Sequence, residues 1–138
     1  MGDVVDESGK IIAGAKGRKG AIIDTEKCLV NGEFAKLLLG TYTTIGCILT
    51  DAKLSKVEAN LIASISHNGL ARAIRPVHTM YDGDTMFCLA SGRRPVVNFA
   101  PVQSAAVEAT RLAIVNAVSK SAQYEIVFDQ DEDCDTQQ

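Results

Sequence analysis

The chain has 138 residues, a net charge of −3 at pH 7, 46% hydrophobic residues and only 5% aromatic residues. This length fits one domain or part of a larger one, with an aliphatic core. The acidic balance argues against a nucleic-acid binder, which usually shows a basic stripe, and no apolar run approaches the length of about 18 residues that predicts a membrane span.

The four cysteines lie far apart, with no C-x-x-C pair and no histidine at ligand spacing. This pattern fits neither a zinc site nor a disulfide framework, and nothing else in the sequence indicates a metal or an organic cofactor. Cys47 and Cys88 lie in apolar runs and are predicted to be small core residues. Reduced thiols fit a cytoplasmic protein.

The first 20 residues are rich in glycine. Val4-Val5 and Ile11-Ile12 predict a small hairpin with its turn at Ser8-Gly9. The glycines from 14 to 20 match neither a dinucleotide fingerprint nor a P-loop, so we interpret this stretch as a flexible loop. A short helix is predicted over residues 33–39, closed by Gly40.

The next segments predict a strand followed by a helix. Residues 43–50 form a β-branched and apolar run that is typical of a buried strand, and Asp51 is predicted to be a turn residue or helix N-cap. Leu54, Val57, Leu61 and Ile65 recur at helical spacing. They predict a helix over residues 54–68, ended by Asn68-Gly69.

Strands dominate the pattern after Pro76. Residues 76–80, 85–90 and 96–99 are predicted strands, with Asp82-Gly83 as a turn between the first two. A second long helix is predicted from Pro101 to Lys120, with proline in its first turn. Residues 124–128 predict a last strand, and the acidic run 129–135 predicts a disordered tail. The fold class is therefore mixed α/β (α+β), with two amphipathic helices covering one sheet face.

Three groups of residues are candidates for chemistry, and each alone favours a structural role. Thr43-Thr44 begins a strand, where threonine is common. Asp82-Gly83-Asp84 is typical of a solvated turn and lacks the further acids of an EF-hand. His67 falls at the predicted helix end, where it can cap carbonyls, and a structural role is also favoured for His78.

In their order and spacing, these groups resemble one family, the DmpA-type peptidases, over nearly all of residues 2–120. The family includes L-aminopeptidase/D-Ala-esterase/amidases, β-peptidyl aminopeptidases and nylon-oligomer hydrolases. The resemblance is carried by Thr43-Thr44-Ile45-Gly46, Thr50-Asp51-Ala52-Lys53-Leu54, His67-Asn68-Gly69-Leu70-Ala71-Arg72-Ala73-Ile74-Arg75-Pro76-Val77-His78-Thr79, Asp82-Gly83-Asp84-Thr85, Ala90-Ser91-Gly92, and, before them, Gly2-Asp3-Val4-Val5-Asp6 and Gly9-Lys10-Ile11-Ile12-Ala13-Gly14-Ala15.

The resemblance implies a precursor that cuts its own chain between Tyr42 and Thr43, within an αββα sandwich similar to that of N-terminal-nucleophile (Ntn) hydrolases. Thr43 matches the family's nucleophile, and Asp82 and Asp84, 39 and 41 residues further on, match the acidic pair of the nylon-hydrolase branch. It also implies three regions: residues 1–42 upstream of the cut, the nucleophile-bearing domain 43–122, and the terminal strand and tail 123–138.

The implied chemistry is consistent with the properties of these groups. A threonine hydroxyl is a poor nucleophile unless a base takes its proton. After cleavage, Thr43 carries its own α-amino group, with a reference pKa of about 7.7–8.0, which can act as that base. We assign Asp82 and Asp84 to orientation and hydrogen bonding, because a nearby carboxylate favours the charged form of the amine.

Two departures from the family shape the expectation. Tyr42 stands where the family commonly has Asn or Gly. The family's upstream portion supplies the oxyanion-hole Asn and half of the sandwich. Either this chain is a fragment of a longer protein that contains that portion, or an upstream α-chain-like polypeptide is expected to supply it. By resemblance the partners are that polypeptide, a small peptide or amide substrate, and further copies in a homo- or hetero-oligomer. The alternative is a catalytically inactive truncated paralogue or assembly subunit.

Overall fold

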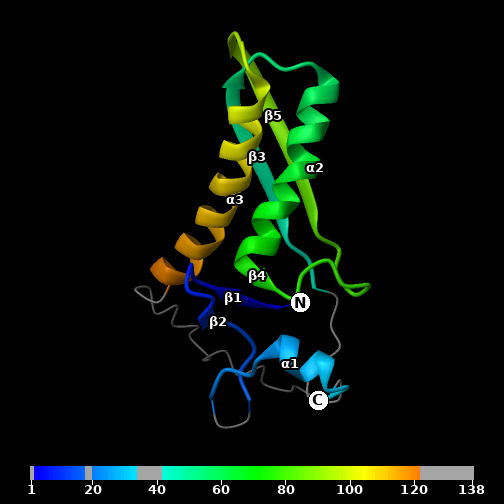
Figure 1. The fold of residues 1–138 in the computed structure, drawn as a ribbon, viewed down its shortest axis with the longest axis vertical. Helices are drawn as coiled ribbons and strands as arrows, with labels where there is room; N and C mark the ends of the chain where they lie inside the picture. Colours follow the sequence, from blue (N-terminus) through cyan, green and yellow to red (C-terminus); the bar gives the residue numbers. More distant parts are fainter. Residues whose placement is uncertain (1, 18–19, 34–41, 122–138) are drawn as a thin grey trace, which may run out of the picture.

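The computed structural model describes residues 2–17, 20–33 and 42–121. Figure 1 shows two parts of unequal size. Two long strands and two long helices form an elongated body, and short strands with one short helix lie at its lower end. The architecture is mixed α and β, as the sequence predicts.

The small sheet at the lower end is built from the N-terminal hairpin. Strands β1 (Asp3–Val5) and β2 (Ile11–Ala13) pair antiparallel, and β4 (Ile74–Arg75) pairs with the other edge of β1. The turn of the hairpin is closed by the Gly9 amide, which donates to the Asp6 carbonyl, and Gly9 takes a left-handed φ of 82°. The predicted hairpin is confirmed.

A short helix that the sequence analysis missed follows this hairpin. Helix α1 (Thr25–Val30) begins at Asp24, whose side chain accepts a hydrogen bond from the Lys27 amide, as N-cap aspartates do. The predicted helix 33–39 lies outside the described residues except for Glu33, which is not helical. Lys16, in the predicted loop 14–20, forms an isolated antiparallel bridge with Ile22, which follows the loop.

The main sheet is a parallel pair, β3 (Ile45–Ala52) and β5 (Thr85–Arg94), in the register Ile45 with Thr85 to Thr50 with Ala90. Helices α2 (Lys56–Ala73) and α3 (Phe99–Ser121) pack on each other and lie on one face of this pair. The predicted strand 43–50 is confirmed in kind, although β3 begins at Ile45. β5 extends four residues beyond the predicted 85–90.

Helix α2 differs from its prediction at both ends. Its N-cap is Ser55, which forms a capping box with Glu58. Asp51 lies within β3, so the prediction that Asp51 is a turn or cap residue was wrong. Asn68-Gly69 does not end the helix, which continues to Ala73. Gly69 is buried at the contact with α3, where its missing side chain lets the helices approach closely.

Two predicted strands were wrong. Residues 76–80 form an irregular connection in which His78 takes a left-handed φ of 58°, and residues 96–98 precede a helix rather than pair with a strand. Helix α3 confirms the second long helix, with Pro101 in its first turn, where the missing amide donor is harmless. The predicted strand 124–128 and the acidic tail lie outside the described residues.

The core lies between the parallel strands and the two helices. It includes the buried side chains of Ile62, Leu70, Ala73, Met86, Ala106 and Val107. Alternate residues of each strand point the other way, because successive side chains of a strand face opposite sides. On that side Ile45 is 72% exposed, Leu49 75%, Phe87 53% and Leu89 63%.

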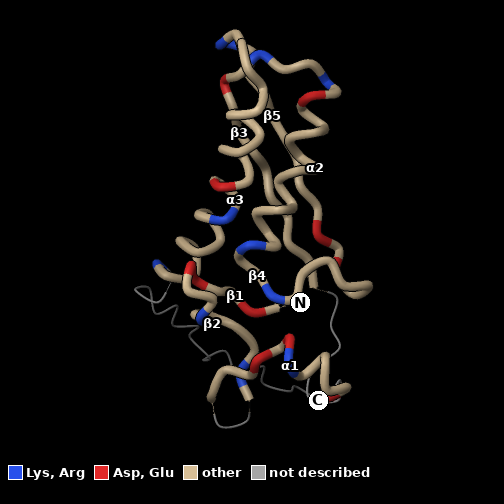
Figure 2. The backbone as a smooth tube through the Cα atoms, viewed as in Figure 1, with Lys and Arg blue, Asp and Glu red and all other residues tan. Residues whose placement is uncertain are grey.

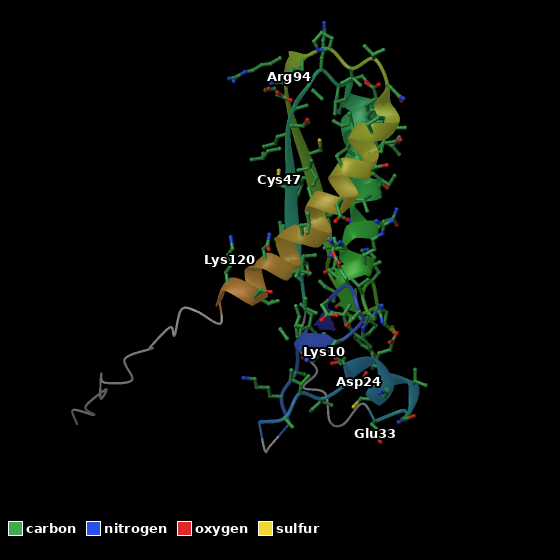
Figure 3. All side chains as sticks on the ribbon, turned by 60° about the vertical axis from the view of Figure 1, so that its left-hand side comes forward. Lys10, Asp24, Glu33, Cys47, Arg94 and Lys120 are labelled. Carbon is green, nitrogen blue, oxygen red and sulfur yellow. The ribbon has the colours of Figure 1, made fainter. Side chains whose placement is uncertain are left out.

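This apolar face of β3 and β5 is open among the described residues. The charged residues of the pair (Asp51, Arg93 and Arg94) lie together at its far end (Figure 2), where Arg94 Nε is 2.7 Å from an Asp51 carboxylate oxygen. Cys47 lies on the open face (Figure 3) and is exposed, so its prediction as a core residue was wrong. Cys88 is half-buried, and burial raises the pKa of its thiol, with a smaller contribution from Cys47.

Candidate active site

Thr43 lies where the chain enters β3, beside the turn that leads into β5. The two segments are joined on both sides of Thr43. The Gly83 amide donates to the Tyr42 carbonyl at 2.9 Å, and the Thr85 amide donates to the Thr44 carbonyl at 2.9 Å. Tyr42 and Asp82 form a parallel bridge. The residues that the sequence singled out, Thr43 and the Asp82–Asp84 turn, are therefore direct neighbours.

Gly83 provides the space for the Thr43 hydroxyl. A Cβ atom added to Gly83 would lie 2.9 Å from Thr43 Oγ1, closer than real Cβ contacts come. The glycine between the two acids therefore has a steric role that a solvated turn would not require. Thr43 is itself exposed, so its hydroxyl is not sealed in the core.

Asp84 anchors the residue after Thr43. Its Oδ1 accepts a hydrogen bond of 2.8 Å from the Thr44 amide. The side chain is only 1% exposed, and its second oxygen, Oδ2, has no hydrogen-bond partner among the described residues. Nδ1 of His78 lies 3.8 Å from this oxygen, at ion-pair distance.

Asp82 is held by its own turn. Its Oδ2 accepts hydrogen bonds of 2.8 Å from both the amide and the hydroxyl of Thr79. Burial acts to raise the pKa of the Asp82 carboxyl, but hydrogen bonds, those from Thr79 among them, and a nearby positive charge outweigh it, so this pKa is lowered. Asp82 is thus ionised at neutral pH. Its bonds to Thr79 shape the turn that carries Gly83.

The sequence analysis assigned no role in the site to a pair of histidines beside Asp84. His67 lies within α2 rather than at its end, and its Nδ1 is 2.8 Å from Nε2 of His78. Burial lowers the pKa of His67, the neighbouring His78 lowers it further, and Asp84 raises it. These residues are 11 positions apart on a helix and a loop, and no local pattern in the sequence predicts their contact.

A cavity of about 290 Å³ opens beside Thr43. Its lining joins the start of β3 to the N-terminal segment: Gly2, Val4, Ala15, Thr25, Tyr42, Thr43, Thr44 and Ile74. The segment upstream of Thr43 therefore forms a wall of the site, and the residues that hold that segment in place also shape the site.

Asp3 holds the upstream segment together. Its carboxylate is buried and accepts hydrogen bonds from the amide of Ala15 and from both the amide and the hydroxyl of Thr25, at 2.7–3.1 Å. The sequence analysis missed this role, because an aspartate at the start of a strand carries no signal for partners 12 and 22 residues away.

We expect Asp3→Ala to lower the free energy of unfolding by about 3 kcal/mol, since it leaves the buried amide and hydroxyl of Thr25 and the part-buried amide of Ala15 without their acceptor. Urea unfolding followed by circular dichroism measures this loss. Asp6→Ala is the matched control. It removes a similar set of bonds to Ser8 and Lys10 in the same hairpin, but at an exposed position, and should cost much less. Equal losses for the two variants would contradict the structural role of Asp3.

Comparison with known proteins identifies the family of the chain. The sequence model of peptidase family S58 matches residues 7–130, which include Thr43, both acids and both histidines. The chain belongs to peptidase family S58. The resemblance to the DmpA-type peptidases is thereby confirmed.

Curated relatives of this S58 chain include peptidases and amide hydrolases. An uncharacterized aminopeptidase of Mycobacterium tuberculosis is 49% identical over 80 residues, which cover 58% of this chain and 23% of the relative. A 6-aminohexanoate-oligomer endohydrolase of Paenarthrobacter ureafaciens is 29% identical over 96 residues, 66% of this chain and 27% of the relative. The match thus spans about a quarter of the length of these relatives.

The described residues contain no group of three or more His, Cys, Asp or Glu side chains arranged to hold a metal ion. Within the same ranges, no helix combines the length and the apolar character needed to cross a bilayer.

Proposed function

We propose that this chain is the nucleophile-bearing portion of an Ntn aminopeptidase or amidohydrolase, which cuts its own backbone before Thr43 and then hydrolyses amide bonds of small peptides or related amides. The family and the names of the relatives support the reaction class. The local geometry around the Tyr42–Thr43 bond supports the position of the cut.

One observation carries this proposal. The carbonyl of the bond to be cut, Tyr42 C=O, accepts a hydrogen bond from the Gly83 amide, and the Thr43 hydroxyl lies against the same glycine. When a hydroxyl attacks a carbonyl carbon, negative charge develops on the carbonyl oxygen, and a donor already aimed there stabilises it. Gly83 N–H is such a donor within this chain.

The steps balance as an acyl shift followed by hydrolysis. Thr43 Oγ1 forms a bond to the Tyr42 carbonyl carbon, the bond from that carbon to the Thr43 nitrogen breaks, and the hydroxyl proton passes to the leaving nitrogen. Water then hydrolyses the resulting ester and frees the hydroxyl and the α-amine of Thr43. The Asp84–Thr44 bond holds the new terminus in place, so that the amine can serve as base for the hydroxyl.

The open apolar face of β3 and β5 supports a partner. In an αββα sandwich a second sheet covers such a face, and we propose that an upstream α-chain-like polypeptide supplies it together with the oxyanion donor for substrate. Oligomers of the completed unit follow from the same proposal. An inactive assembly subunit would use the same face, so activity and not association distinguishes the two functions.

N-terminal sequencing and intact mass of the purified chain test the cut. We expect a fragment that begins with Thr43-Thr44-Ile45, formed either by the chain alone or after addition of the upstream portion of the mycobacterial relative. Hydrolysis is then measured with amino-acid anilides and 6-aminohexanoate oligomers. A chain that associates with the upstream portion but stays uncut and inactive would support the assembly subunit instead.

A further inference from the structure

The buried carboxylate of Asp84 needs a partner for its second oxygen. Oδ1 is bonded to the Thr44 amide, but Oδ2 has no hydrogen bond among the described residues although the side chain is only 1% exposed. An ionised carboxylate withdrawn from water is costly unless a charge or donor compensates it. His78 Nδ1, at 3.8 Å, is a group that can provide both.

His78 is fixed on its other side by His67. The 2.8 Å contact between His67 Nδ1 and His78 Nε2 requires one ring to donate and the other to accept. Two doubly protonated rings would both be donors, so the pair holds at most one positive charge while this bond persists. If His67 donates, His78 accepts at Nε2 and keeps its proton on Nδ1, the nitrogen that faces Asp84.

The backbone at His78 also indicates a specific role. Its φ of 58° is in the left-handed region, which is uncommon for residues other than glycine, although histidine adopts it more readily than most residues, as asparagine and aspartate do. Strained residues of this kind persist where the surrounding structure holds them, and they are concentrated at functional sites. Here the conformation occurs at the residue whose ring lies between His67 and Asp84.

We propose that His78, supported by His67, is a positioning residue of the Thr43 site, which acts through the buried Asp84 carboxylate that its Nδ1 faces. Asp84 in turn holds the Thr44 amide, next to the nucleophile. The other acid of the turn, Asp82, is bonded to Thr79, and helix α2 contributes His67 to this cluster. The effect on catalysis rests on the function proposed above, whereas the electrostatic coupling does not.

The coupling is tested first, by NMR titration of the imidazole protons in the 138-residue chain. We expect the pKa of His67 to lie below its ordinary value and to fall further in Asp84→Asn, because the Asp84 charge raises it. The pKa of His67 should rise in His78→Asn, because this substitution removes the lowering effect of the His78 ring. Thr43→Ala is the matched control and should leave the titration of His67 unchanged. A His67 pKa that does not respond to Asp84→Asn would overturn the proposal.

The effect on the nucleophile is tested with two substitutions that tolerate the left-handed backbone. His78→Asn keeps an amide donor near the position of Nδ1 but does not titrate, whereas His78→Gly removes the donor. We expect His78→Asn to keep most of the rate of cleavage at Thr43 while losing the part of its pH dependence that follows the histidine pair. His78→Gly should slow cleavage by about 10-fold or more, as the loss of a partner to a buried charge does.

The outcomes separate the two proposals. Equal rates and equal pH profiles for wild type, His78→Asn and His78→Gly would overturn the positioning role, even with the coupling intact. If wild type is never cut under any condition, the proposed function fails. The titration of His67 then decides alone whether Asp84, His78 and His67 are coupled.

Discussion

Thr43→Ala is expected to abolish both the cut before residue 43 and any hydrolysis of small amides. The substitution removes the hydroxyl that attacks the Tyr42 carbonyl carbon, and the α-amine cannot be released without the cut. Loss of a catalytic nucleophile typically costs about 10⁴-fold or more in rate, which places both reactions at background. Intact mass after prolonged incubation measures the first reaction, and anilide hydrolysis by the completed protein measures the second.

Two neighbouring variants serve as controls. Thr43→Ser keeps a hydroxyl and should retain cleavage. Thr44→Ala should also retain it, because the bonds of Thr44 to Asp84 and Thr85 use its backbone amide and carbonyl. A fragment beginning at residue 43 in Thr43→Ala, or hydrolysis at an unchanged rate, would rule out this threonine as the nucleophile.

Gly69→Ala is expected to destabilise the fold, although alanine is the better helix former. At an exposed position in a helix, the change from glycine to alanine gains about 1 kcal/mol. At Gly69 a Cβ atom would collide with the Val107 carbonyl and the Thr110 side chain, so α2 and α3 would have to move apart. We expect a net loss of about 2–3 kcal/mol, in the range of overpacked cores. Urea unfolding of the purified variant measures it.

Ala71→Gly provides the comparison for this second prediction. Ala71 is two residues further along the same helix and exposed, so its replacement should cost only the difference in helix propensity, about 1 kcal/mol. If Gly69→Ala were stabilising, the close approach of the two helices at Gly69 would not exist in solution.

The elements that the sequence predicted well are those with a regular period and a local signal at their ends. α3 has apolar residues at helical spacing and a proline in its first turn, and both signals depend only on residues within one or two turns. The hairpin of β1 and β2 is equally local. The Ser55–Glu58 capping box was also present in the sequence, and attention to it would have corrected the start of α2.

The errors occur where contacts between distant segments override local preference. Asn68-Gly69 has the composition of a helix end, yet Gly69 continues α2 because α3 needs a residue without a side chain there. Residues 76–80 contain apolar and β-branched side chains but form no strand, since His78 is held in a left-handed conformation between its two partners. Cys47 was assigned to the core from its apolar neighbours, but it lies on the open face of β3.

By itself, the sequence determined the mixed α and β class, the two long helices and, through a family resemblance, a candidate nucleophile with two candidate acids. Only the tertiary structure decided that the Gly83 amide meets the Tyr42 carbonyl and that His67 and His78 meet beside Asp84. It also decided that Asp84 is buried, with one oxygen that accepts no hydrogen bond from any described residue. The physical reason is the separation along the chain over which each kind of signal acts. Periodicity and caps act over a few residues, whereas the site depends on the pairing of segments about 40 residues apart, and chain geometry alone does not specify that pairing.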